Sequence, residues 1–314
     1  MADNGQTSVL VLILATAVTA GTPILYAALG ELLAERAGVI NLGVEGMMLI
    51  GAVCGFIAAL SFQSPWAGVV AAMLAGGLVA AIHAFLTVTM RSDQVVSGLA
   101  LTIFGAGLSG FLGKGYVGTP LPAPFAARPL AVLGDIPVIG PIFFNHDPLV
   151  YITYLMVPAI WMFIYKTKPG LHLRAVGENP SAADSLGVNV FLSRYVYVIA
   201  GGMLAGVGGA YLSLAYAPSW LENMTAGRGW IAVALVIFAI WNPVRALVGA
   251  YIFGGIDALG FRLQVLGVMV PSFFLKMLPY IFTVLVLIIV IGRNRAARAG
   301  TPKALGLSFD REER

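Results

Sequence analysis

Two polar side chains within an apolar stretch are the first candidates for chemistry. Glu45 follows Asn41 by four residues, a spacing that would place both on one face of a helix. A carboxylate at membrane depth costs about 2.5–3.5 kcal/mol on insertion scales, so it normally faces a cavity or a polar partner. The pair predicts either a solute-pathway or gating site, or a hydrogen bond that pins one helix to another. Gly38, Gly43 and Gly46 favour an unwound or closely packed entry to this helix.

Other ionisable residues lie apart from this pair. Asp257 lies in a second apolar stretch, and Arg262, five residues further on, is a candidate partner near its end. His83, His146 and His172 are too scattered along the chain to predict a metal site. We expect His83, which lies within an apolar stretch, to make a helix–helix contact.

No catalytic motif is present in the sequence. A Walker A phosphate loop is missing, because Gly113-Lys114 is followed by Gly115 instead of Ser or Thr. Residues 105–110 match G-x-G-x-x-G, but they lie within an apolar stretch with no preceding strand, which favours close helix packing. We therefore expect a protein that is not an enzyme and binds no cofactor or metal itself.

The elements that position these residues follow from composition. The chain has 314 residues, of which 59% are hydrophobic and only 10% charged, against about 25% charged in soluble domains. This composition indicates a polytopic membrane protein, and no basic stripe interleaved with aromatic residues predicts nucleic-acid binding. We expect an all-α integral membrane bundle of about nine transmembrane helices, within a range of eight to ten.

The expected spans follow from the length of each apolar stretch, since a crossing needs about 20 residues. They are 8–29, 39–60, 66–90, 94–112, 148–165, 194–216, 229–241, 244–262 and 273–292. Segment 229–241 is too short to cross and ends at Asn242-Pro243, so we expect a broken or re-entrant helix there. Small residues at four-residue spacing predict close packing; they are Gly51, Gly55, Gly201, Gly202, Ala205, Gly206, Gly208 and Gly209.

A polar island at 166–194 interrupts the apolar chain. Within it, Asn179 is placed as the N-cap of a short helix, Pro180 at its first position and Gly187 just past its end. A rigid, charged helix of this kind between two spans predicts a docking element for a soluble partner.

The distribution of basic residues predicts the orientation. With nine spans and the C-terminus inside, 13 of the 18 basic residues fall on the inner side, as positively charged loops do in the cytoplasm. These are Arg36, Arg91, Lys166, Lys168, Arg174, Arg194, Arg245, Arg293, Arg295, Arg298, Lys303, Arg311 and Arg314. We therefore expect the N-terminus outside, the C-terminus inside and the polar island in the cytoplasm.

The domain organisation is a single transmembrane domain over 1–292, followed by a basic cytoplasmic tail at 293–314 that we expect to be solvated. Loop 113–147 falls outside and is rich in proline, so we expect it to be stiff and poorly helical. Its prolines are Pro120, Pro122, Pro124, Pro129, Pro137 and Pro141, with Pro148 at its boundary. The loop is either a lid or docking surface for an external partner, or an inert connector.

Three stretches resemble a known family in the right order along the chain. Glu35-Arg-Ala-Gly-Val-Ile-Asn-Leu-Gly-Val-Glu-Gly-Met-Met-Leu-Ile-Gly51 resembles the early signature of permease subunits in bacterial ATP-binding-cassette (ABC) importers for branched-chain amino acids, simple sugars and nucleosides. Arg174-Ala-Val-Gly-Glu-Asn-Pro-Ser-Ala-Ala183 looks like their cytoplasmic coupling segment. Thr225-Ala-Gly-Arg-Gly-Trp-Ile231, with Trp241-Asn-Pro243 and Gly249, resembles their late signature. The wording of the first stretch is most similar to nucleoside-type permeases.

The resemblance implies a division of labour in a cell inner membrane. This chain would form the translocation pathway with a second permease, itself or a sister, while two cytoplasmic ATPase subunits bind ATP and Mg²⁺ and an extracytoplasmic binding protein delivers the solute. The implied coupling helix would use Arg174, Gly177, Glu178, Asn179, Pro180, Ser181, Ala182 and Ala183, and the pathway Asn41, Glu45 and Asn223. The alternatives are a sugar or branched-chain amino acid as solute, or an ion-coupled secondary transporter.

Overall fold

The protein is an all-α bundle in the residues that its computed structural model describes, which are 9–265, 272–293 and 300–311. The helices are α1 Val9–Arg36, α2 Val44–Phe62, α3 Pro65–Ala84, α4 Gln94–Gly113, α5 Pro148–Lys166, α6 Lys168–Glu178, α7 Pro180–Ser185, α8 Val190–Tyr211, α9 Arg228–Phe238, α10 Pro243–Val265 and α11 Ser272–Arg293. Short helical turns η1 Phe85–Thr89, η2 Lys114–Tyr116, η3 Gly140–Phe144 and η4 Leu212–Tyr216 extend or precede them. No strand occurs within these described ranges, only two isolated β-bridges.

Each of the nine expected spans coincides with a helix, so their placement along the chain is confirmed. Within the described residues, six helices are long and apolar enough to cross a membrane: α1, α2, α3 with η1, α4 with η2, α5, and α8 with η4. Helices α10 and α11 are similar in length, with 23 and 22 residues. Nine crossings in total stays a prediction.

Helix α9 is too short to cross, as expected. Its 11 residues rise about 16 Å, roughly half of a hydrocarbon core of about 30 Å. The chain leaves the helix through Ile240 and Trp241, both with φ near 52°, and α10 then begins at Pro243. The backbone groups at the start of α9 therefore need partners inside the protein.

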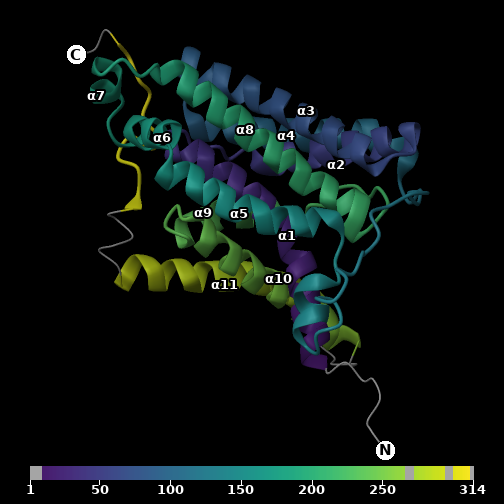
Figure 1. The fold of residues 1–314 in the computed structure, drawn as a ribbon. Helices are drawn as coiled ribbons and strands as arrows, with labels where there is room; N and C mark the ends of the chain where they lie inside the picture. The colour runs from purple at the N-terminus through teal and green to yellow at the C-terminus, as the bar shows by residue number, and fades with distance from the viewer. Residues whose placement is uncertain (1–8, 266–271, 294–299, 312–314) are drawn as a thin grey trace, which may run out of the picture.

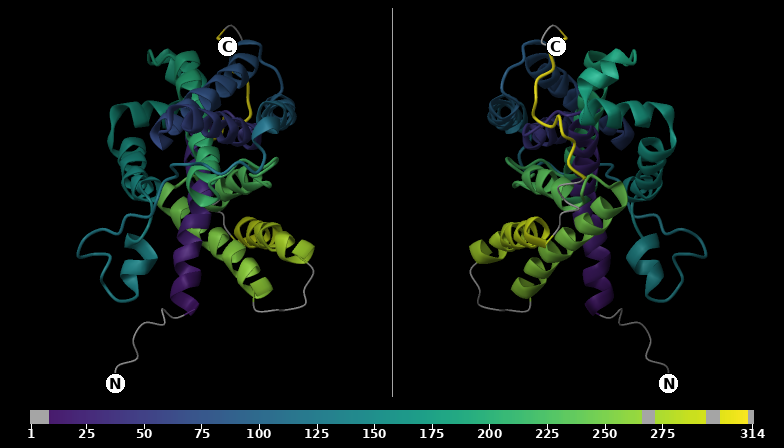
Figure 2. Two further views of the ribbon diagram at one scale, coloured as in Figure 1. Left: turned by 90° about the vertical axis from the view of Figure 1, so that its right-hand side faces the viewer. Right: turned by 90° about the vertical axis from the view of Figure 1, so that its left-hand side faces the viewer.

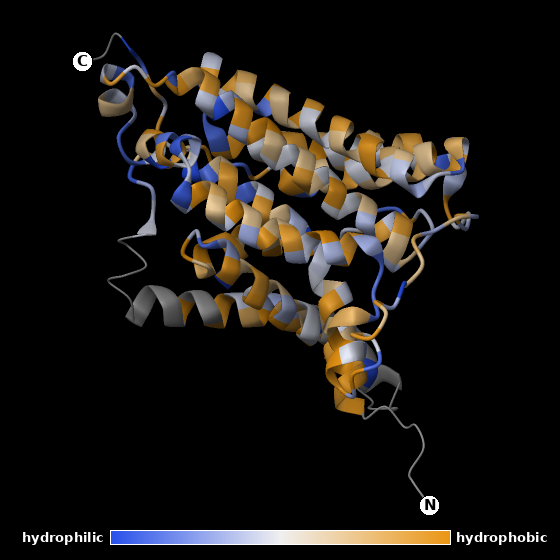
Figure 3. Cartoon of the chain, in the orientation of Figure 1, coloured by the Kyte–Doolittle hydropathy of each residue, from blue (hydrophilic) through white to orange (hydrophobic). Residues whose placement is uncertain are grey.

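Helix α8 lies at the centre of one half of the bundle, where it packs against α1, α2 and α3 (Figure 1). Helix α1 joins the two halves, since its other long contact is with α10. In two further views, the start of α1 and the C-terminal segment lie at opposite ends of the bundle (Figure 2). Hydrophilic residues gather at the end that carries α6, α7 and the C-terminal segment (Figure 3).

The small residues of α8 explain how closely these helices approach. A Cβ added to Gly206 would lie 2.2 Å from the carbonyl oxygen of Ala72 on α3. One added to Gly51 on α2 would lie 2.4 Å from the carbonyl oxygen of Gly206. Backbone meets backbone at both positions, so the predicted close packing of small residues is confirmed.

We expect Gly206→Ala to lower the free energy of unfolding by about 1–3 kcal/mol, because the new methyl group overpacks a rigid contact. The measurement is the melting temperature (Tm) of the purified protein in mild detergent. Gly107→Ala on α4 is the control, since its added Cβ meets nothing within 4 Å. Equal Tm values for the two variants would contradict the packing argument.

Candidate functional site

Asn41 lies in a non-helical break between α1 and α2 and is buried. Its backbone N–H donates to Glu31 Oε1 (2.9 Å), and its side-chain oxygen accepts from the N–H of Gly43 (3.0 Å). The prediction that Asn41 and Glu45 share a helix face is therefore wrong. The chain turns at Gly38, whose φ of 87° is a conformation that favours glycine. Helix α2 begins at Val44, so Asn41 precedes it.

Side chains of α3 and α4 hold this break in place. Gln94 Oε1 accepts from the backbone N–H of Ile40 (2.8 Å). His83 lies between the carbonyl oxygen of Ile40 (2.9 Å) and the hydroxyl of Ser97 (3.0 Å). The predicted helix–helix role of His83 is confirmed, and both backbone polar groups of Ile40 are paired with side chains of α3 and α4.

Glu45, in the first turn of α2, accepts three hydrogen bonds. Its Oε1 accepts from the Thr225 hydroxyl (2.5 Å) and the N–H of Gly227 (2.8 Å), and its Oε2 accepts from the N–H of Gly229 (2.6 Å). The residue is only 5% exposed. A carboxylate there satisfies N–H groups at the start of α9 and is stabilised by the positive end of the helix dipole.

Gly229 lets the two segments come this close. A Cβ on Gly229 would lie 2.6 Å from the backbone nitrogen and Cα of Glu45. The contact thus joins the first turn of α2 to the broken helix α9, which favours the pinning alternative for Glu45 over a freely exposed pathway group. Its assignment to the pathway stays a prediction.

We expect Glu45→Gln to lower the free energy of unfolding by about 1.5–3 kcal/mol, because charged hydrogen bonds are lost and an amide N–H₂ group must face backbone donors. Thermal unfolding in detergent measures this. Glu222→Gln is the matched control, since Glu222 is exposed in the loop before α9. An unchanged Tm with abolished solute uptake would instead assign Glu45 to the pathway.

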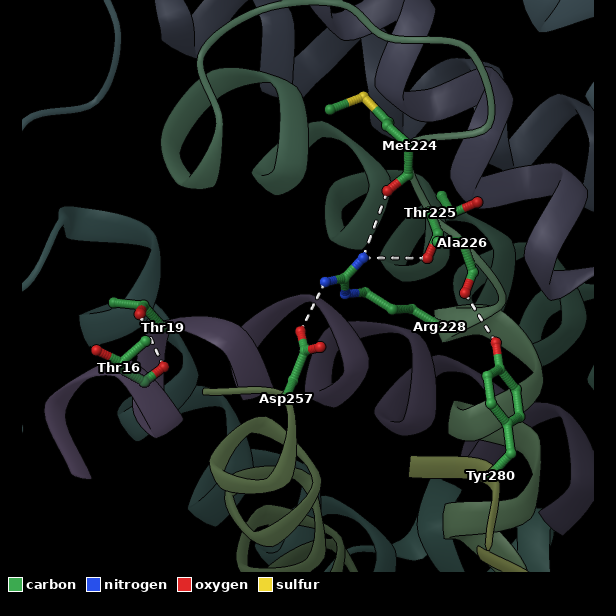
Figure 4. Close-up of polar contacts among 8 residues, drawn as sticks. All are labelled: Thr16, Thr19, Met224, Thr225, Ala226, Arg228, Asp257 and Tyr280. Atoms are coloured by element: carbon green, nitrogen blue, oxygen red, sulfur yellow. Dashed lines mark hydrogen bonds and ion pairs between the residues drawn. The ribbon is translucent and has the colours of Figure 1, made fainter. Parts of the chain in front are cut away.

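Arg228, the first residue of α9, forms an ion pair with Asp257 on α10 (Figure 4). The distance from Nη2 to Oδ2 is 2.8 Å, and Nη1 faces the carbonyl oxygens of Met224 and Thr225 at 3.4 and 3.3 Å. The predicted partner Arg262 is therefore wrong. The loop before α9 brings Arg228 to Asp257 from 29 residues away, a contact that local spacing cannot reveal.

A cavity of about 220 Å³ opens beside this ion pair. Its walls come from α1, α9, α10 and α11, and include Ile24, Arg228, Phe253, Asp257, Pro279 and Tyr280. Tyr280 donates its hydroxyl hydrogen to the carbonyl oxygen of Ala226 (2.8 Å), and the Arg228 guanidinium lies over the ring of Tyr216. Two opposite charges and aromatic rings therefore converge on one space within the bundle.

Asn223, the third predicted pathway residue, lies in the exposed loop that leads to α9. It has φ of 53°, and its carbonyl oxygen accepts from the N–H of Ala226 (3.0 Å). The structure thus places Asn41 and Glu45 in buried polar contacts and Asn223 in an exposed turn, so the three do not form one lining. Their pathway role stays a prediction.

The polar island forms two helices, α6 and α7. The predicted caps are present: Asn179 Oδ1 accepts from the N–H of Ala182 (3.0 Å), Pro180 starts α7, and Gly187 has φ of 85°. The sequence analysis did not predict α6. Thr167 caps this helix, because its side-chain oxygen accepts a hydrogen bond from the backbone N–H of Gly170.

The eight predicted coupling residues face different ways. Glu178, Asn179, Ser181 and Ala182 are exposed, whereas Arg174 and Pro180 are half-buried. Gly177 and Ala183 are buried; a Cβ on Gly177 would lie 2.1 Å from the carbonyl oxygen of Arg36. Leu186, at the end of α7, is 85% exposed.

The C-terminal segment 300–311 packs against this island instead of being solvated. Phe309 is buried in a cluster with Val176, Ala183 and Val190. The N–H of Ala304 donates to the carbonyl oxygen of Gly177 (2.9 Å). Basic side chains in the segment find acidic partners that compositional reasoning did not assign.

Three ion pairs anchor the segment at its exposed edge. They are Lys303–Glu178 (2.7 Å), Arg311–Asp184 (2.6 Å) and Asp310–Arg91. The hydrogen bond with Glu178 raises the pKa of the Lys303 ammonium, and that with Asp184 raises the pKa of Arg311.

We expect Phe309→Ala to release the C-terminal segment, since truncating a buried phenylalanine costs about 3–5 kcal/mol. Trypsin cleavage after Arg174, in α6, should then become faster in the intact, detergent-solubilised protein. Phe111→Ala is the control, because Phe111 is 78% exposed. Cleavage at the wild-type rate would show that α6 and α7 hold their structure without the segment.

Comparison with known proteins matches residues 13–291 to a family model described as the permease component of branched-chain amino acid transport systems. The chain is 36% identical to the guanosine ABC transporter permease protein NupQ of Bacillus subtilis, over 98% of both chains. It is 36% identical to the nucleoside permease protein NupC of Lactococcus lactis, over 95% of this chain and 96% of the relative. It is 44% identical, over 94% and 96%, to TsgC13 of Haloferax volcanii, whose name gives glucose as a provisional substrate.

Sequence reasoning missed Arg228 and Tyr280, which complete the cavity, and the buried acidic residues Glu31 and Glu35 on α1. Helix α1 runs to Arg36, beyond the expected end at 29, so both carboxylates lie inside the bundle. The Trp241 indole N–H donates to Glu35. The signal available in the sequence was the four-residue spacing of Glu31 and Glu35 at the end of an apolar stretch.

Proposed function

This chain belongs to the family of permease components of branched-chain amino acid transport systems, and on that premise we propose that it is the membrane subunit of an ATP-driven importer. It would form the translocation pathway for a small polar solute, with a nucleoside as the first candidate. Relatives at 36% identity over nearly the whole chain are named for guanosine and nucleosides. A simple sugar is the second candidate, because a relative at 44% identity is named for glucose.

The exposed α6–α7 segment carries the proposal. It stands at the hydrophilic end of an otherwise apolar bundle, and Leu186 at its tip is 85% exposed (Figure 3). A capped helix that presents a large apolar side chain at its end can supply an anchor for a pocket of a soluble protein. The partner is a cytoplasmic ATPase, which binds ATP and Mg²⁺ in place of this chain.

Movement of the docked segment can reach the bundle through tight contacts. Arg36, the last residue of α1, donates to the Tyr165 hydroxyl on α5 (3.1 Å) and to the carbonyl oxygen of Trp241 (2.9 Å). The close contact of Gly177 with Arg36 ties α6 to the same point. A push on α7 would therefore tilt α1, α5 and the α9–α10 turn together, as rigid-body rocking between outward- and inward-facing states requires.

The other subunits of the proposed importer follow from the role of this chain. A second permease, identical or a sister chain, would complete the pathway, and an extracytoplasmic binding protein would deliver the solute. The chain would cross the inner membrane with its N-terminus outside and the α6–α7 segment inside. Asn41, Glu45 and Asn223 stay the proposed pathway residues. Glu45 would act through its hydrogen bonds to the start of α9.

We expect Leu186→Asp to weaken ATPase binding about 30-fold, because removing a central apolar anchor from an interface costs about 2 kcal/mol. The readout is the amount of ATPase that co-purifies with the permease in mild detergent. Leu186→Met keeps an apolar side chain and should retain the ATPase. Full retention with Leu186→Asp would overturn docking at α7, and ion-driven uptake without any ATPase would overturn the importer.

A further inference from the structure

The cavity beside Arg228 and Asp257 lies near the middle of α1 and α10 and at the start of α9. Ile24 is near the centre of α1, Asp257 lies beyond the midpoint of α10, and α9 begins at the cavity wall. Discontinuous helices with their ends inside a bundle are where transporters place solute sites, because such ends offer polar groups at membrane depth.

The charged pair keeps bonding capacity for a ligand. Asp257 uses Oδ2 for Arg228, and none of the described residues bonds its other oxygen, Oδ1. The guanidinium has five N–H donors, and the contacts to Asp257 and two carbonyls leave some of them open. An acceptor on Asp257 and a donor on Arg228 thus lie side by side. Two neighbouring hydroxyl groups can bond to both, because each hydroxyl donates and accepts.

The rest of the wall is apolar and aromatic. Phe253 and Tyr280 line the same space, and Figure 4 shows Asp257 and Tyr280 on either side of Arg228. Aromatic faces suit the C–H face of a sugar ring. The volume of about 220 Å³ lies below the roughly 300–1,000 Å³ of pockets for drug-sized ligands, so one ring fits better than a larger solute.

We propose that this cavity binds the hydroxylated ring of the transported solute, with Asp257 accepting from and Arg228 donating to adjacent ring hydroxyls. The inference rests on the proposed function and refines it. The bound chemistry is the part that a nucleoside and a hexose share, and relatives of this chain are named for guanosine and for glucose.

A zwitterionic amino acid is the competing ligand, since its two charges also match the pair. Its ammonium and carboxylate would use the same open groups as the hydroxyls, Asp257 Oδ1 and the free Arg228 N–H groups, beside the 2.8 Å ion pair. Two full charges cost more to remove from water than neutral hydroxyl groups, so this partly buried site favours the neutral ring.

The test is solute-dependent thermal stabilisation of the purified, full-length permease in detergent, since a ligand that binds only the folded state raises Tm. The probes are guanosine, glucose, 2′,3′-dideoxyguanosine and leucine. We expect guanosine and glucose to raise the Tm. The dideoxy analogue keeps the base but lacks both ring hydroxyls, so its apparent dissociation constant should be at least about tenfold weaker.

Three variants make the test specific. Asp257→Asn should weaken guanosine and glucose binding about tenfold or more. Asp257→Glu keeps the charge beside Arg228 but displaces the carboxylate by one methylene, so it should also weaken binding, and it serves if the first variant does not fold. Asp135→Asn is the matched control, because Asp135 is exposed in the loop before α5, and it should bind as the wild type does.

Several results would overturn the proposal. These are no shift with either sugar-containing probe, equal shifts with guanosine and its dideoxy analogue, a shift with leucine alone, or wild-type binding in both Asp257 variants. ATP-driven uptake by the reconstituted complex is measured separately. Its absence beside an intact binding shift would contradict the importer and leave the site standing.

Discussion

The carboxylate of Glu45 holds the start of a helix that stops halfway through the bundle, and much of the structure depends on that contact. A helix of 11 residues inside a membrane protein exposes backbone N–H groups that no water can satisfy. Glu45 accepts from two of them and from Thr225. The hydrogen bonds of Glu45 bring α2 against the loop before α9. That loop places Arg228 next to Asp257. The buried charge, the broken helix and the cavity are therefore one arrangement.

The ion pairs of the described residues form two separate groups, one partly buried in the interior and one exposed at the hydrophilic end. In the interior, Arg228 and Asp257 are partly buried beside a cavity, and each limits the desolvation cost of the other. At the hydrophilic end, Lys303 and Arg311 form exposed ion pairs whose individual contribution to stability is small. There the burial of Phe309 holds the C-terminal segment to α6 and α7. Close glycine contacts along α8 connect the helices between these two places.

Much of the fold was predictable, because the bilayer allows few structures. Each of the nine expected apolar ranges contains a helix, and the short α9 ends at Phe238, before Asn242-Pro243. Asn179, Pro180 and Gly187 cap α7 as their residue types indicated. Two expectations failed for the same reason: Asn41 does not share a helix with Glu45, and Arg262 is not the partner of Asp257. Both relied on spacing along a continuous helix. The glycines around Asn41 favoured an unwound entry, which the structure has, but a contact between helices is not visible in local spacing.

Composition and local pattern were enough to predict the class of the molecule, the positions of its long helices and the capped helix α7. These properties depend on composition, apolar length and local backbone chemistry, which act over a few residues. Contacts between distant residues had to be read from the folded chain: Glu45 meets the start of α9, Arg228 meets Asp257, and residues 300–311 pack against one side of the α6–α7 segment. Those contacts join residues 29 to 184 positions apart, and they exist because helices packed through glycine bring distant backbones together.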